Sequence, residues 1–286
     1  MIHNLGGQYD IHYITLANNC RVAYIDEGSG DQVLFFIHGL ATYGRSWHYQ
    51  VEGLKHKYRC IAIDLPGNGH SDRGNYPYGI NFFSGCVYDM IQRMGLKRVT
   101  IVGHSMGGQI AINLVAHEPE VAEKLVLCAP AGFERFNAME RSIYQGTVSF
   151  LDMFSSDENS LRKVIRSSFY RYPDQTDAMI NELIDIMHRH PSREYHSMIE
   201  ACINGMLNEP VFDMLHKIQQ PTLVMFGERD ALIPNRLIHP YHTKQVAETG
   251  AKEIPDAILR MVPQCGHFLQ MEKPGVVNEY IVDFAG

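Results

Sequence analysis

Short apolar runs alternate with segments of helical periodicity along most of this chain. One such run, Val33-Leu34-Phe35-Phe36-Ile37, has no polar position, which is typical of a strand covered on both faces. The segments between the runs place apolar residues three and four apart, and this spacing predicts helices. The pattern predicts strands at residues 11–16, 21–26, 33–37, 60–63, 99–102, 125–128, 221–226 and 258–262, and helices at 44–54, 82–94, 109–117, 237–248 and 276–284.

Because these strands alternate with helices at short intervals, we expect an α/β fold. We expect its eight-stranded sheet to be mostly parallel and doubly wound, with helices on both faces. In such sheets ligands bind beyond the carboxyl ends of the strands. The residues that follow each strand are therefore the first candidates for chemistry.

The alternation stops at Ala131, and only helical periodicity continues to about Gln220. We therefore expect a helical cap, residues 132–216, inserted after the sixth strand of a core domain made of residues 1–131 and 217–286. Apolar seams at helical spacing are usually core. The alternative is that a pliable, Met-rich underside of the cap lines an apolar pocket, and both can hold on different faces. The seams are Met179, Ile180, Leu183, Ile184 and Met187, and Met198, Ile199, Cys202, Ile203, Met206 and Leu207.

Charge and composition exclude several function classes. With a net charge of −7 and a pI near 6.1, the chain lacks the clustered Lys and Arg of a nucleic-acid surface. No apolar run approaches the roughly 18 residues of a membrane span. The first residues have neither the charged nor the apolar region of a signal peptide, so we expect a cytoplasmic protein.

The cysteines and histidines give no sign of a metal site. The six cysteines are scattered without CxxC spacing, and we interpret them as free, although an even number leaves disulfides open. The pairs His188/His190 and His239/His242 have no third ligand in a zinc pattern, and we interpret them as surface histidines. Neither a GxGxxG dinucleotide fingerprint nor a P-loop is present. The sequence therefore implies no cofactor and no metal.

The segment Val99 to Gly108, VTIVGHSMGG, has the form of a nucleophile elbow, GxSxG between a strand and a helix. Such a turn forces Ser105 into a strained backbone conformation and lifts its hydroxyl above the sheet edge. Side chains at positions 103 and 107 would collide with this turn, so glycine suits both. The helix start beneath the serine also favours negative charge there. Ser105 is therefore the candidate nucleophile.

Two further candidates follow later strands, Asp230 after the seventh and His267 after the eighth. A serine hydroxyl becomes a good nucleophile when an imidazole takes its proton, and a carboxylate on the other ring nitrogen fixes the tautomer. The order Ser, Asp, His along the chain is the one expected for an α/β-hydrolase. Glu228 is the nearby alternative to Asp230 as the acid, and Asp64 is a remote one.

Other residues near the strand ends are predicted to be structural. We expect His38 and His104 to bind loop carbonyls, and Asp64 and Asp72 to cap turns. Trp47, the only tryptophan, is expected in the core, and the alternative is a place at the edge of the pocket.

Five motifs, the first His38-Gly39-Leu40 and the last Gly266-His267-Phe268, follow one another along the chain. Together they resemble the α/β-hydrolase superfamily over nearly the whole chain. More narrowly, GHSMGGQIA followed by LVLCAPAGF resembles the monoacylglycerol lipase and carboxylesterase branch. The resemblance implies a serine hydrolase that cleaves small carboxylic esters with an apolar acyl or aryl part through an acyl-enzyme intermediate. It also implies that the backbone N–H groups of Leu40 and Met106 form the oxyanion hole. The five motifs are His38-Gly39-Leu40, residues 64–72, Gly103-His104-Ser105-Met106-Gly107-Gly108, Gly227-x-x-Asp230 and Gly266-His267-Phe268.

Other activities of this fold are alternatives. Haloalkane dehalogenases and epoxide hydrolases carry Asp at the elbow, where this chain has Ser105, and proline iminopeptidases usually show GGSWG in place of GHSMG. Hydrolases of carbon–carbon bonds in ring-cleavage products use the same triad but commonly carry Trp after the histidine, where this chain has Phe268. Cofactor-free perhydrolysis and a small-molecule receptor of this fold stay open, because fold alone does not decide function.

Overall fold

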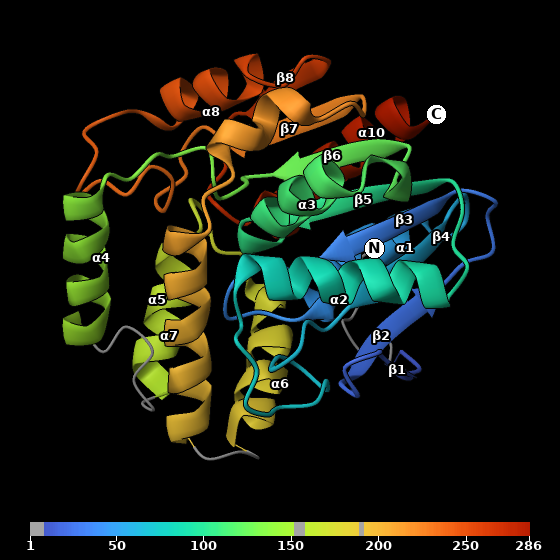
Figure 1. The fold of residues 1–286 in the computed structure, drawn as a ribbon, viewed down its shortest axis with the longest axis horizontal. Helices are drawn as coiled ribbons and strands as arrows, with labels where there is room; N and C mark the ends of the chain where they lie inside the picture. Colours follow the sequence, from blue (N-terminus) through green and yellow to red (C-terminus); the bar gives the residue numbers. More distant parts are fainter. Residues whose placement is uncertain (1–8, 152–157, 189–191) are drawn as a thin grey trace.

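The computed structural model describes residues 9–151, 158–188 and 192–286, and these form one eight-stranded sheet between helices (Figure 1). The strand order is β1-β2-β4-β3-β5-β6-β7-β8. β2 is antiparallel to its neighbours β1 and β4, and all other pairs are parallel. This is the mostly parallel sheet that the sequence predicts. The strands are β1 His12–Thr15, β2 Arg21–Glu27, β3 Val33–Ile37, β4 Arg59–Ile63, β5 Val99–His104, β6 Lys124–Cys128, β7 Thr222–Gly227 and β8 Ala257–Val262.

Helices cover both faces of the sheet, so the fold is doubly wound as predicted. In Figure 1, α2 (Ile80–Arg93) and α3 (Met106–His117) lie in front of the sheet, and α1 (His48–Leu54) and α10 (Pro274–Ala285) lie behind it. Every residue of the central strands β3 and β5 is buried between these layers. Trp47 is fully buried as predicted, with its ring centroid 5.0 Å from that of Phe36.

In the described part of the stretch between β6 and β7, the chain forms four α-helices. They are α4 (Ala138–Leu151), α5 (Glu158–Ser167), α6 (Asp177–His188) and α7 (Ser192–Asn208). Figure 1 shows them on the side to which the arrowheads of β3 and β6 point. This helical insert therefore lies at the carboxyl ends of the strands, where the candidate residues are expected. Within the described ranges, no helix combines the length and the apolar character needed to cross a bilayer.

Both apolar seams of the insert pack as core. The α7 seam joins the main core, whereas the α6 seam forms a second cluster with Phe268 and Met271, which follow His267. Burying an aliphatic side chain contributes about 1.5–3 kcal/mol, so the two clusters bind the insert firmly to the sheet. Met187 lies outside the residues whose side chains are described. The buried seam residues are Met179, Ile180, Leu183 and Ile184 on α6, and Met198, Ile199, Cys202, Ile203 and Leu207 on α7; Met206 is partly buried.

Two predicted helices differ in more than a shift of their ends from the observed ones. The helix expected at 237–248 starts only at Thr243, as α8 (Thr243–Lys252). Pro240 has no N–H and its ring clashes with the preceding turn, so a helix does not run through it. The helix expected at 44–54 begins as a 3-10 turn, η1 (Gly44–Trp47), before α1. The remaining short elements are α9 Leu269–Glu272, η2 Pro119–Val121, η3 Asp174–Thr176 and η4 Phe212–Lys217.

All six cysteines are free, as the sequence predicts, and all six are buried. Burial raises the pKa of Cys60, Cys202 and Cys265 to about 12 in each case. Because the thiolate is the reactive form, these thiols are unreactive at neutral pH.

Candidate active site

Ser105 lies in the sharp turn between β5 and α3, with φ +53° and ψ −119°. A residue other than glycine in such a conformation costs on the order of 1–3 kcal/mol, which the surrounding structure must offset. Here the Ser105 N–H donates to the Cys128 carbonyl at 3.0 Å, and the Ser105 carbonyl accepts the N–H groups of Gly108 at 2.9 Å and Ala131 at 3.0 Å. The strained turn predicted from the sequence is therefore present, and hydrogen bonds on both sides hold it.

The loop that follows β3 lies directly against this turn. A Cβ on Gly39 would be 3.1 Å from the Cβ of Ser105, and a Cβ on Gly107 would overlap the carbonyl oxygen of Ile37. Among the described residues, the N–H groups of Leu40 and Met106 have no hydrogen-bond acceptor. Two unpaired amides thus come from the two segments that meet at the serine.

His267 and Asp230 are hydrogen-bonded to each other. His267 Nδ1 is 2.9 Å from Asp230 Oδ2, and the two side chains are almost fully buried. Asp230 Oδ1 accepts the backbone N–H groups of Leu232 at 2.8 Å and Ile233 at 3.0 Å. Since the carboxylate accepts at both oxygens, Nδ1 is assigned as the protonated nitrogen, which leaves Nε2 with a free lone pair.

The structure brings Asp230 and His267 together, but Ser105 is not hydrogen-bonded to His267. Among the hydrogen bonds of the described residues, none joins the Ser105 hydroxyl to the His267 ring. Such contacts are often long until substrate binds, so apo geometry does not exclude a candidate. The two alternative acids lie elsewhere: Glu228 is exposed, and Asp64 accepts the N–H groups of Gly44 and His70.

His38 and His104 have the structural roles that the sequence predicts. His38 Nδ1 is 2.8 Å from the Gly39 carbonyl oxygen, and its Nε2 is 3.0 Å from the Leu65 nitrogen. His104 Nε2 is 3.1 Å from the carbonyl oxygen of His267. Burial lowers the pKa of both rings, and proximity to His267 lowers that of His104 further. Both are therefore neutral supports of the loops that surround Ser105.

The prediction that His239 lies on the surface is wrong. Its ring is buried, and Nδ1 is 2.8 Å from Oε1 of Glu134, which also accepts the Asn235 N–H at 2.9 Å. Burial raises the pKa of Glu134, and the bonds from His239 and Asn235 oppose that shift. The pair joins the start of the insert to the loop after Asp230. His242 is exposed, and His188 and His190 lie outside the residues whose side chains are described.

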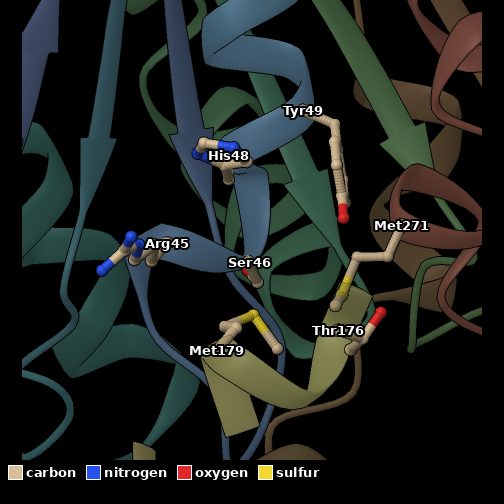
Figure 2. Close-up of a pocket in the computed structure, with 7 residues that line it drawn as sticks. All are labelled: Arg45, Ser46, His48, Tyr49, Thr176, Met179 and Met271. Carbon is tan, nitrogen blue, oxygen red and sulfur yellow. The ribbon is translucent and has the colours of Figure 1, made fainter. Parts of the chain in front are cut away.

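A separate hollow opens between η1, α1 and the insert (Figure 2). It is open to solvent, and the empty space within it, including part of the open solvent, is about 280 Å³. The side chain of Arg45 at its edge is paired with Glu182. Because Ser105, Asp230 and His267 do not line this hollow, it is not assigned to the reacting groups. Its walls are Arg45, Ser46, His48, Tyr49, Thr176, Met179 and Met271.

Three features together define a class of protein. They are the strained Ser105 at the turn after β5, the hydrogen-bonded pair of Asp230 after β7 and His267 after β8, and the strand order of the sheet. Residues 32–274 match the family described as alpha/beta hydrolase fold, and the chain belongs to that family. The superfamily predicted from the motifs is therefore confirmed, whereas the monoacylglycerol lipase and carboxylesterase branch stays a prediction.

Individual relatives are distant but cover most of the chain. An uncharacterized hydrolase of Bacillus subtilis strain 168, YugF, is 25% identical over 261 residues, which are 90% of this chain and 91% of the relative. Epoxide hydrolase 2 of Caenorhabditis elegans is 25% identical over 290 residues, covering 96% and 79%. A solved structure of a probable hydrolytic enzyme from Pseudomonas aeruginosa PAO1 has a TM-score of 0.83 at 23% identity, covering 96% and 94%. The comparisons support a hydrolase without specifying its substrate.

Proposed function

We propose that this protein is a serine hydrolase of carboxylic esters with an apolar acyl or aryl part. Ser105 is the nucleophile, His267 the base and Asp230 the acid that orients it, and the N–H groups of Leu40 and Met106 form the oxyanion hole. The observation that carries the proposal is the 2.9 Å bond between His267 and buried Asp230, at the sheet edge where Ser105 occupies its strained turn. Epoxide hydrolysis is not proposed, because that class carries Asp at the elbow.

The reaction follows from these positions. His267 Nε2 takes the proton of Ser105 as the hydroxyl oxygen attacks the ester carbonyl carbon, and the carbonyl electron pair moves onto the oxygen between the two N–H groups. Each such donor typically contributes about 10²–10³ in rate. The imidazolium, stabilised by Asp230, then protonates the departing alcohol and leaves an acyl-enzyme. Water attacks this intermediate by the same steps, releases the acid and restores Ser105.

We further propose that residues 132–216 act as a cap over the core domain, residues 1–131 and 217–286. Two observations support this role: the insert lies at the carboxyl ends of the strands, and its Phe169 ring stacks on Phe268, the neighbour of His267, at 5.0 Å between centroids. An apolar cap encloses the acyl chain, and each buried CH₂ contributes about 0.8 kcal/mol. We therefore expect kcat/KM to rise several-fold for each two carbons until the pocket is full, and then to fall.

The test is a series of p-nitrophenyl and monoacylglycerol esters from about C2 to C16, each assayed with the wild-type protein and with Ser105→Ala. A peaked profile that the alanine variant abolishes supports both proposals. Hydrolysis with a flat profile would remove the cap's role in selecting the acyl chain. Turnover of ring-cleavage dienoates in place of esters would assign the protein to the carbon–carbon hydrolases, and stoichiometric binding without turnover would assign a receptor.

A further inference from the structure

A turn of the insert, Ser168–Arg171, is docked on the turn that carries His267. The His267 N–H donates to the Ser168 carbonyl at 2.9 Å. The two backbones are so close that a Cβ on Gly266 would be 2.5 Å from the nitrogen of Tyr170. Together with the stacking of Phe169 on Phe268, these contacts attach the insert directly to the backbone around His267.

One carboxylate, that of Glu272, joins the two turns. Glu272, at the end of α9, accepts the Gly266 N–H through Oε2 at 2.9 Å and the Tyr170 N–H through the same oxygen at 3.1 Å. Its Oε1 accepts the Arg171 N–H at 2.8 Å. Bonds from N–H groups to an ionised carboxylate are roughly twice as strong as neutral ones. A single side chain therefore fixes amides from two segments that lie nearly a hundred residues apart in the sequence.

We propose that Glu272 is a positioning residue, which couples the insert to the catalytic histidine. The inference depends on the role of His267 in the proposed function. Asp230 holds the His267 ring and Ser168 holds its backbone, and Glu272 holds Ser168–Arg171 in place. Loss of this carboxylate leaves three amides without their acceptor and releases the insert turn. A displacement of about 1 Å at a reacting group costs on the order of 10²-fold in rate, so a small shift of His267 has a measurable effect.

Amide hydrogen exchange tests the coupling without any substrate. We compare wild-type protein with Glu272→Ala and, as a matched control, with Glu279→Ala, which removes an exposed carboxylate from the adjacent α10. Glu272→Ala should speed exchange at the amides of Gly266, Tyr170 and Arg171 by about tenfold or more. The decisive amide is that of His267, which Glu272 does not contact. Faster exchange there supports the coupling, and unchanged exchange there overturns it.

Kinetics then separates positioning from general stabilisation. With a good ester, Glu272→Ala should lower kcat by about 10- to 100-fold while KM stays within about twofold, and Glu272→Gln should lie between, because its amide has one acceptor oxygen in place of two. In a His267→Ala background the same substitution should cause no further loss. An equal loss in both backgrounds, or a kcat like that of Glu279→Ala, would overturn the inference. A wild-type protein that hydrolyses no ester defeats the proposed function, and the exchange experiment then decides the coupling alone.

Discussion

Replacing Asp230 by asparagine tests the acid of the proposed triad with almost no change of shape. In the structure, one carboxylate oxygen accepts from His267 Nδ1 and the other accepts the N–H groups of Leu232 and Ile233. An asparagine must keep its single oxygen on those two donors, which turns its NH₂ toward Nδ1. The ring then accepts at Nδ1 and carries its proton on Nε2. The lone pair that would take the proton of Ser105 is lost.

The expected loss in kcat is about 10⁴-fold, close to 5.5 kcal/mol of transition-state stabilisation. Stability should suffer less, by about 1–3 kcal/mol, because both backbone bonds to position 230 persist and only the charged bond to His267 is weakened. The substitution should therefore separate activity from folding. Trp47, the only tryptophan, is buried beside Phe36 and reports unfolding by its fluorescence.

The assay is kcat on the best ester of the series, per mole of folded protein, with Glu228→Gln as the control. Glu228 is exposed and only two residues away, and its change to glutamine should alter kcat by less than about twofold. The reasoning is refuted if Asp230→Asn keeps more than about a tenth of the activity, or if Glu228→Gln is the more damaging change.

Three further outcomes follow from the same contacts. Ser105→Ala should lower kcat by about 10⁶, and mass spectrometry should place a fluorophosphonate label on Ser105; a label elsewhere contradicts the assignment. Gly107→Ala puts a Cβ against the Ile37 carbonyl oxygen and should lower the free energy of unfolding by about 1–3 kcal/mol in urea denaturation, whereas an unchanged midpoint contradicts the close approach. Because burial lowers the pKa of His38 and His104, the unfolded chain binds more protons than the folded one below about pH 6.5. The free energy of unfolding should therefore fall as the pH drops below that value, by at most about 1.4 kcal/mol per pH unit for each histidine, and His104→Gln should flatten the slope.

The candidate residues that the sequence singles out depend on local pattern. Ser105 stands out because its glycines and its strand and helix lie within a few residues of it. Asp230 and His267 stand out because they follow buried apolar runs whose carboxyl ends meet at one sheet edge. The sequence leaves the choice between Asp230 and Glu228 open, and of these two carboxylates Asp230 is the one hydrogen-bonded to the His267 ring.

The features that the sequence does not predict join distant segments. The sequence around His239 gives no sign that its ring is buried, but Glu134 and Phe136 from the start of the insert enclose it. Glu272 has no local signal either, since Tyr170 and Arg171 come from the insert. The residues that contact His239 and Glu272 come from a distant segment of the chain. The sequence near His239 and Glu272 therefore does not identify these partners.

The six buried thiols give the protein a practical property: its surface offers no reactive sulfur to a maleimide or a methanethiosulfonate reagent. A cysteine introduced at exposed Asp185 on α6 and another at exposed Glu52 on α1 would thus be labelled selectively, without first removing the native ones. A pair of spin labels at these positions would give the distribution of distances between insert and core in solution, and its width would measure how far the two parts move relative to each other.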